Sequence, residues 1–294
     1  MLKGSIVALV TPMTPNGELD LPALKNLVDW HIQAGTHGLV LLGSTGEGVT
    51  LQTAEKKLLL ETALTQAKGQ IPIIAGTGSN STAQTIEQTL LAKSLGAVAA
   101  LVVAPYYNKP TQEGMFLHYK KIAEETNFPI ILYNVPSRTA SDLLPATVAR
   151  LSQLPNIIGI KEATGDLKRL ENLKEHCKPG FLLYSGDDAS AMDFILQGGD
   201  GVISVCANIL PDLWSKMCTA ALKQEVAIAK GYNDSLKTLN QRLYLESNPI
   251  PVKWALSWMG KIKAGIRLPL TPLAAEHIPS LEHALQEAGL HAAV

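Results

Sequence analysis

The feature that most constrains the fold of this chain is a regular alternation between short apolar segments and segments with helical spacing. Each apolar segment is continuous rather than alternating with polar residues, which is typical of parallel strands covered on both faces. Eight such segments precede residue 206, namely Ser5–Val10, Gly38–Leu42, Ile71–Ala75, Ala99–Ala104, Pro129–Val135, Ile157–Ile160, Phe181–Tyr184 and Gly201–Val205.

Between these segments, aliphatic residues recur at helical spacing, and capping residues such as Asp20 and Ser81 stand where helices would begin. Strand and helix units in regular succession predict an α/β fold with a parallel sheet. An open, doubly wound sheet is one alternative. The even size of the units, and the lack of a G-x-G-x-x-G motif after the first segment, favour a closed (β/α)8 TIM barrel.

After the eighth apolar segment, the spacing predicts further helices, which we interpret as the last barrel helix followed by an appended helical bundle. These helices are Leu213–Ala229, Ser235–Leu245, Val252–Met259 and Leu281–Ala288. We therefore expect a barrel over residues 1–224 and a C-terminal helical extension packed on it over residues 225–294.

Composition excludes several classes of function. The formal net charge is −1 and 46% of the residues are hydrophobic, which argues against a nucleic-acid or membrane partner and for a large core. Three cysteines without a C-x-x-C pair indicate reduced thiols, and no segment is long enough for a signal peptide or a membrane span, so we expect a cytoplasmic protein. The histidines show no metal-ligand spacing, and we expect neither a metal nor a cofactor.

Active sites of such barrels lie at the carboxyl ends of the strands, so the residues there are the candidates for chemistry. The strongest is Lys161, which follows the fully apolar segment Ile157–Ile160. Burial in a low-dielectric barrel disfavours the ammonium and frees the amine as a nucleophile. The alternative is a lysine that extends along the strand edge to solvent.

The other strand ends carry weaker signals when each is taken alone. Ser44 and Thr45 lie in a glycine-flanked loop, which is suited to ligand binding or simply to a tight turn with a helix cap. Tyr106 and Tyr107 could act in proton transfer or bury area against another subunit. Tyr133 supplies a phenol at the end of the fifth strand.

Arg138, five residues after Tyr133, offers a planar fork for a carboxylate, although a lone arginine is more often structural. Asp187 and Asp188 are more typical of a helix cap than of a pair of catalytic carboxylates. The glycine-containing loop 76–81 is similarly typical of a turn into a capped helix.

Together and in this order, the strand ends resemble the family of dihydrodipicolinate synthase and N-acetylneuraminate lyase over essentially the whole chain. The superfamily motifs are Gly-Ser-Thr-Gly-Glu at 43–47, Tyr-Asn-Val-Pro at 133–136 and the strand with Lys161. Within it, Pro-Tyr-Tyr-Asn-Lys-Pro at 105–110 and Ser-Arg-Thr at 137–139 indicate the synthase branch.

The resemblance implies a lyase of lysine and diaminopimelate biosynthesis, a homotetramer built as a dimer of dimers, that condenses pyruvate with L-aspartate-4-semialdehyde to 4-hydroxy-tetrahydrodipicolinate. By the same resemblance, Lys161 forms the imine with pyruvate and Tyr133 transfers protons. Ser44 links Tyr133 to Tyr107, which reaches in from a neighbouring subunit.

The resemblance further assigns the pyruvate carboxylate to Thr45 and the semialdehyde carboxylate to Arg138, with Gly186 and Ile203 lining the pocket through main-chain groups. Ser44 stands where the synthases mostly carry threonine, and serine is familiar from the sugar-acid lyases. An N-acetylneuraminate lyase or a keto-deoxy sugar-acid aldolase is therefore the alternative. Arg138 favours the synthase, because a polyol aldehyde has no carboxylate to bind.

Feedback-inhibited members of the family bind lysine at a subunit interface through a serine, two histidines, an asparagine, a glutamate and a tyrosine. The aligned residues here are Gly48, Thr53, Lys56, Asn80, Gln84 and Tyr106. Gln84 supplies no full negative charge, and Lys56 places a cation where a cationic ligand would lie. We therefore expect a vestigial allosteric site and an enzyme weakly sensitive or insensitive to lysine.

Overall fold

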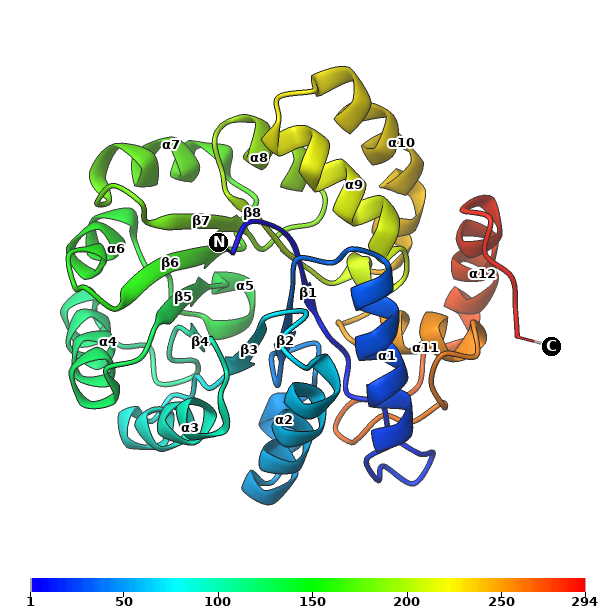
Figure 1. The fold of residues 1–294 in the computed structure, drawn as a ribbon, viewed down its shortest axis with the longest axis horizontal. Coiled ribbons are helices and arrows are strands. Elements are labelled where there is room, and N and C mark those ends of the chain that lie inside the picture. The colour runs from blue at the N-terminus through cyan, green and yellow to red at the C-terminus, as the bar shows by residue number, and fades with distance from the viewer. Residues whose placement is uncertain (1, 294) are drawn as a thin grey trace.

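The computed structural model describes residues 2–293 and contains a closed barrel of parallel strands (Figure 1). Neighbouring strands follow the sequence order, and β1 pairs with β8 from Gly4↔Gly201 to Val7↔Ser204, which closes the ring. The predicted fold class is confirmed. The strands are β1 (Gly4–Ala8), β2 (Gly38–Leu41), β3 (Ile73–Gly76), β4 (Ala99–Val103), β5 (Ile130–Asn134), β6 (Ile157–Glu162), β7 (Leu182–Ser185) and β8 (Gly201–Ser204).

Helices surround the barrel, and several of them begin where the sequence supplies an N-cap side chain. Asp20 accepts a hydrogen bond from the Ala23 amide at 3.1 Å, and Ser81 accepts one from the Gln84 amide at 3.3 Å, as expected. The helices of the barrel are α1 (Leu21–Gln33), α2 (Thr53–Ala67), α3 (Thr82–Leu95), α4 (Gln112–Thr126), α5 (Pro136–Thr139), α6 (Pro145–Ser152), α7 (Leu167–His176), α8 (Ala191–Leu196) and α9 (Pro211–Leu222). Thr111 caps α4 in the same way.

Two apolar cores explain why the strand segments lack polar alternation. One fills the barrel interior and includes Ile6 and Ala8 of β1. The other lies between strands and helices, and includes Val7 of the same strand. Because successive side chains point to opposite faces of a strand, each strand buries both of its faces.

The C-terminal helices differ from the prediction at one point. The expected helix Leu213–Ala229 is wrong, because the chain forms two helices, α9 and α10 (Val226–Arg242), with a turn at residues 223–225 between them. Gln224 adopts a positive φ of 60° in this turn. Leu222 and Val226 keep a helical spacing across this turn, and no glycine or proline lies between them. Both helices also bury a face in the same core, so periodicity alone conceals the break.

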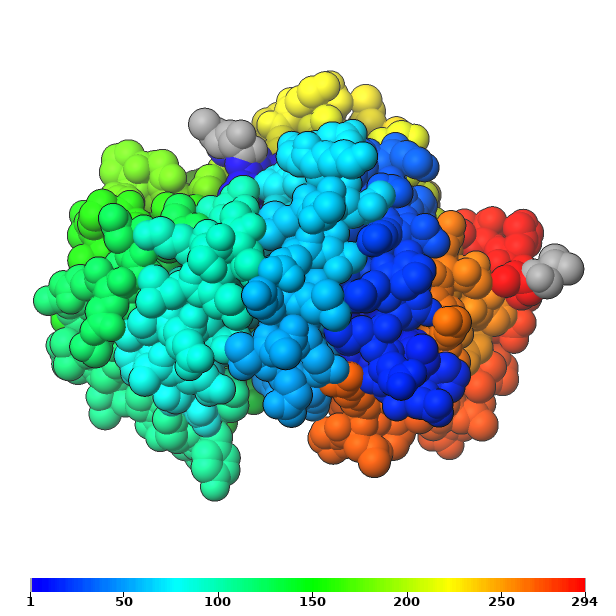
Figure 2. Space-filling model, turned by 60° about the horizontal axis from the view of Figure 1, so that its bottom comes forward, coloured from blue at the N-terminus to red at the C-terminus, as the bar shows by residue number. Residues whose placement is uncertain are grey.

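The expected helix Ser235–Leu245 is the second half of α10, and the two last helices occur as expected at α11 (Ile250–Trp258) and α12 (Ile278–Glu287). Helices α11 and α12 pack beside α1 and α10 at one side of the barrel (Figure 1). Figure 2 shows this C-terminal segment continuing the surface next to the N-terminal residues. Within residues 2–293, no helix has the length and hydropathy of a membrane span.

Candidate active site

A cavity of about 280 Å³ opens at the carboxyl ends of the strands, and we call it the mouth cavity. It lies at the edge of the barrel where active sites are found. Its walls come from the strand ends and from the segment that joins α10 to α11. The lining residues are Ala8, Val40, Gly43, Ser44, Thr45, Leu101, Tyr133, Val135, Ser137, Arg138, Lys161, Ala163, Gly186, Asp187, Val205, Tyr244, Glu246, Ser247 and Asn248.

Lys161 lies in β6 and is only 4% exposed, so it does not extend to bulk solvent. Its Nζ lies 4.5 Å from the centre of the Tyr133 ring, on the neighbouring strand β5. Within residues 2–293, this nitrogen forms no ion pair or hydrogen bond with another side chain. A buried amine without a carboxylate partner is the arrangement that a lysine nucleophile needs.

The neighbours of Lys161 leave space around it, and the carboxylate next to it in the sequence faces away from the mouth cavity. A side-chain Cβ at Gly186 would lie 2.9 Å from Cε of Lys161 and 2.6 Å from Cβ of Ala163, so only glycine fits there. Glu162, the next residue of the strand, points to the opposite face, where Asn134 donates to it at 3.1 Å. Burial raises the pKa of Glu162, and hydrogen bonds from Asn134 and Thr164 oppose that effect.

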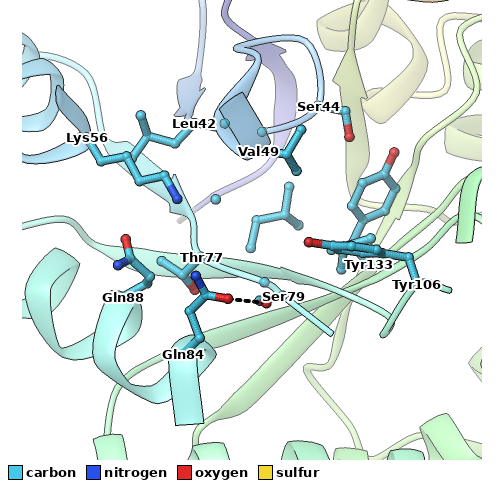
Figure 3. Close-up of a pocket in the computed structure, with 16 residues that line it drawn as sticks. Leu42, Ser44, Val49, Lys56, Thr77, Ser79, Gln84, Gln88, Tyr106 and Tyr133 are labelled. Atoms are coloured by element: carbon cyan, nitrogen blue, oxygen red, sulfur yellow. Dashed lines mark hydrogen bonds between the residues drawn. The ribbon is translucent and has the colours of Figure 1, made fainter. Parts of the chain in front are cut away.

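Tyr133 and Ser44 form one wall of the mouth cavity. Tyr133 ends β5 and is 8% exposed. Ser44 follows β2, and its hydroxyl points toward the hydroxyl of Tyr133 (Figure 3). The structure thus brings together the phenol and the hydroxyl to which the family resemblance assigns proton transfer.

Thr45 is held by the C-terminal extension. It is buried, and its Oγ1 accepts a hydrogen bond from Nδ2 of Asn248 at 2.9 Å. The carbonyl oxygen of Asn248 in turn accepts a hydrogen bond from Nη2 of Arg138, at 3.1 Å. Arg138 itself lies exposed at the rim of the cavity. One residue therefore fixes both of the groups that we expected to bind carboxylates.

A buried ion pair also attaches the loop between β2 and α2 to the C-terminal extension. Glu47 adopts a positive φ of 54°, and its carboxylate pairs with Lys253 of α11, both side chains being almost fully buried. Glu47 also accepts a hydrogen bond from the Arg267 amide at 3.1 Å. Burial lowers the pKa of Lys253, and the Glu47 carboxylate opposes that effect. The loop between β2 and α2 is therefore attached to the C-terminal extension at two points.

Two predicted site residues do not line the mouth cavity of this chain. Tyr107 is 88% exposed and lies outside it. Ile203 belongs to the apolar interior of the barrel, and Val205 lines the cavity at the end of β8 instead. Sequence reasoning missed the lining residues Tyr244, Glu246 and Asn248, because no spacing relates them to the strand ends.

A second, smaller cavity of about 110 Å³ lies behind the wall formed by Ser44 and Tyr133, and we call it the side cavity (Figure 3). Four of the six residues expected at a vestigial lysine site line it: Gly48, Lys56, Gln84 and Tyr106. Thr53 and Asn80 do not. The other lining residues are Leu42, Gly43, Ser44, Val49, Gly76, Thr77, Gly78, Ser79, Gln88, Leu101, Val103 and Tyr133.

The remaining candidates have structural roles. Asp188 accepts hydrogen bonds from the amides of Val205 and Cys206, at 3.1 and 2.9 Å, and so fixes the end of β8. Asp187 accepts from the amide of Ser190 at 3.0 Å, in the turn before α8. No cluster of metal-ligating side chains occurs within residues 2–293.

Within residues 2–293, a closed parallel barrel holds a buried lysine without an ion-pair partner in a polar cavity at its mouth, which is the arrangement of a barrel enzyme with a lysine nucleophile. The particular family follows from its sequence. The chain matches the Dihydrodipicolinate synthetase family over residues 1–288, and it belongs to that family. It is 54% identical over 290 residues to the 4-hydroxy-tetrahydrodipicolinate synthase of Methylococcus capsulatus, which covers 99% of this chain and 100% of that protein.

Solved structures agree with this assignment. The chain resembles the chloride-inhibited dihydrodipicolinate synthase of Acinetobacter baumannii complexed with pyruvate, with a TM-score of 0.97, 51% identity and coverage of 99% and 100% of the two chains. It also resembles the enzyme of Cyanidioschyzon merolae with lysine bound, with a TM-score of 0.95, 34% identity and coverage of 98% and 99%. The resemblance predicted from the strand-end motifs is confirmed.

Proposed function

We propose that the chain condenses pyruvate with L-aspartate-4-semialdehyde to 4-hydroxy-tetrahydrodipicolinate, as a lyase of lysine and diaminopimelate biosynthesis that works through an imine on Lys161. The observation that carries the proposal is Lys161, which is 4% exposed, has no ion-pair partner within residues 2–293, and lies in a cavity that also contains Thr45 and Arg138. The membership of the family described above supports the choice of substrates.

In this mechanism, Nζ of Lys161 attacks the keto carbon of pyruvate, and water leaves as the imine forms. Loss of a proton from the pyruvate methyl group gives an enamine, whose carbon attacks the aldehyde of the second substrate. The amine of that substrate then attacks the imine carbon, closes the ring and releases Lys161. Tyr133 accepts and returns the protons, and the Ser44 hydroxyl faces its phenol (Figure 3).

The carboxylates are bound at two places. The Thr45 hydroxyl and amide hold the carboxylate of pyruvate, and the Arg138 guanidinium binds that of the semialdehyde at the rim. Gly186 leaves the space in which the imine forms, since a Cβ there would lie 2.9 Å from Cε of Lys161. The assignment of Ile203 rests on the family resemblance alone, and any contribution from it would come through its main chain.

The assembly we propose is a homotetramer, a dimer of dimers. Tyr107 is 88% exposed and lies outside the mouth cavity of its own chain, which is the position expected of a residue that acts in a neighbouring subunit. A cytoplasmic location fits the thiols, because Cys177, Cys206 and Cys218 are all free.

Trapping of the imine tests the mechanism. Pyruvate and borohydride should leave a reduced adduct on Lys161, located by peptide mapping, and Lys161→Ala should lower kcat/KM by at least about 10³-fold. The exposed Lys168→Ala provides a matched control that should keep both the adduct and the activity. An adduct on another lysine would refute the mechanism, and turnover with N-acetylmannosamine instead of the semialdehyde would favour the sugar-acid alternative.

A further inference from the structure

Strand β6 contains one residue more than its neighbour β5 in the stretch before the catalytic lysine. Ile130 and Ile131 are consecutive in β5, but their partners in β6 are Ile157 and Gly159, so Ile158 is the extra residue. Such an irregularity is a β-bulge, which is rare between parallel strands. Figure 1 shows β6 between β5 and β7, and the strands form a closed barrel. The bulge therefore lies inside a continuous ring of paired strands.

The bulge changes the face to which the later residues of β6 point. Ile157 packs in the core between strands and helices, and Ile158 packs in the barrel interior. Strict alternation from Ile157 would turn residues 159 and 161 outward, toward the helices. Instead, Gly159 is the partner of Ile131, which belongs to the barrel interior, so two consecutive residues of β6 face inward. Lys161 consequently faces the mouth cavity, because a shift of one residue exchanges the two faces of a strand.

The bulge also brings the backbones of β6 and β7 close together, so that only glycine fits at position 159. A Cβ at Gly159 would lie 2.5 Å from the carbonyl oxygen of Leu182 and 2.8 Å from the Cβ of Leu182, in β7. Gly231 of α10, by contrast, has no atom within 4 Å of such a Cβ. A side chain at position 159 would therefore push β6 away from β7, two residues before the lysine.

A polar cluster on the outer face of the barrel holds the register that follows the bulge. Asn134 and Glu162 are partners in β5 and β6, one residue after the pair that faces the mouth cavity. Nδ2 of Asn134 donates to Oε2 of Glu162 at 3.1 Å and to Oδ1 of Asp142 at 3.0 Å. Arg169 of α7 forms an ion pair with Asp142 and lies 3.6 Å from Glu162. A slip of β6 would break these contacts and leave buried polar groups without partners.

We propose that Gly159 and Glu162 are positioning residues that aim the amine of Lys161 at the bound keto acid. The bulge turns this amine inward, and the outer cluster holds it where Nζ lies 4.5 Å from the centre of the Tyr133 ring. Neither Gly159 nor Glu162 lines the mouth cavity, so both act through the strand. The consequence for catalysis rests on the proposed function. Because the Thr45 loop holds the pyruvate carboxylate, a misplaced amine should slow imine formation without weakening pyruvate binding.

The experiment mixes the enzyme with pyruvate and adds borohydride after timed intervals, which gives the rate constant of imine formation on Lys161. In Gly159→Ala and in Glu162→Gln, the rate constant at saturating pyruvate should fall by at least about tenfold. The pyruvate concentration for the half-maximal rate should change by less than about twofold. Two matched controls should keep the wild-type rate: Gly231→Ala, and Glu175→Gln, which removes a carboxylate that is 76% exposed on α7.

Melting temperatures verify that each variant folds, and if one of the two variants fails to fold, the other decides. A purely structural defect would lower the final amount of adduct rather than its rate constant. An unchanged rate constant in a folded variant would overturn the proposal, and so would an equal loss in the control variants. An absent adduct in the wild type would contradict the proposed function itself, whereas equally fast adduct formation in all the proteins would overturn only the positioning.

Discussion

The mouth cavity and the side cavity each contain one lysine and share the wall of Ser44 and Tyr133, yet they differ in how that lysine is placed. Lys161 is 4% exposed, comes from barrel strand β6, and shares its cavity with Arg138, Asp187 and Glu246. Lys56 is half-buried on a helix and is accompanied by uncharged donors. Burial without a partner suits a nucleophilic amine, whereas partial exposure makes a charged ammonium less costly.

The largest expected effect tests whether both cavities depend on the ion pair between Glu47 and Lys253. Lys253→Met leaves the Glu47 carboxylate buried without its partner, and such a loss costs about 3–5 kcal/mol of unfolding free energy. Urea denaturation measures it. The loop between β2 and α2 borders both cavities, so catalysis should weaken as well.

A double variant, Lys253→Met with Glu47→Gln, removes both charges and keeps an oxygen to accept from the Arg267 amide. It should regain most of the lost stability, because no uncompensated charge remains. If Lys253→Met alone costs less than about 1 kcal/mol, water reaches Glu47 and the pair does not support the loop.

A smaller effect should separate the two cavities. Arg138→Ala removes a charged fork from the rim of the mouth cavity only, and should reduce kcat/KM for the semialdehyde by about 30-fold, or roughly 2 kcal/mol. Adduct formation between pyruvate and Lys161 should stay unchanged. Steady-state kinetics with each substrate varied in turn gives the answer, and unaltered semialdehyde kinetics would make Arg138 a structural residue that only binds the Asn248 carbonyl.

The smallest effect concerns lysine as an inhibitor. We expect half-inhibition only above about 1 mM, which corresponds to a binding free energy weaker than about 4 kcal/mol. Lys56 repels the ligand's side-chain ammonium, and Gln84 offers no carboxylate to pair with it. A dose–response curve measured with both substrates at saturation tests this. Half-inhibition well below 1 mM would mean that other residues recruit lysine.

The sequence predicted the barrel and the strand-end residues because both depend on local patterns. Continuous apolar segments mark strands that are buried on both faces, and the residues at their carboxyl ends meet at one edge whatever the details of the helices. Lys161 could therefore be placed in the cavity from its position after Ile160 alone. The turn at Gln224 could not be predicted, because a left-handed residue other than glycine leaves no mark in the apolar spacing.

The long-range contacts that hold the site in place could not be predicted from the sequence either. Asn248 bonds to Thr45 across 203 residues, and Lys253 pairs with Glu47 across 206. Neither contact has a characteristic spacing, because the sequence does not show where on the barrel the C-terminal extension packs. The expected position of Ile203 in the pocket came from resemblance rather than from a pattern, and the structure puts its side chain in the barrel interior.

The long-range contacts of Asn248 and Lys253 also bear on how the protein is made. A ribosome completes β8 at Ser204, and so all the strands of the ring are available before Asn248 and Lys253 have been translated. Until those residues emerge, Thr45 lacks the side-chain amide of Asn248 and Arg138 lacks its main-chain carbonyl. Glu47 likewise lacks its counter-charge. A chain that ends before Asn248 thus contains the strands of the ring but lacks the groups that position Thr45, Arg138 and Glu47, so the finished binding site depends on translation of the C-terminal extension.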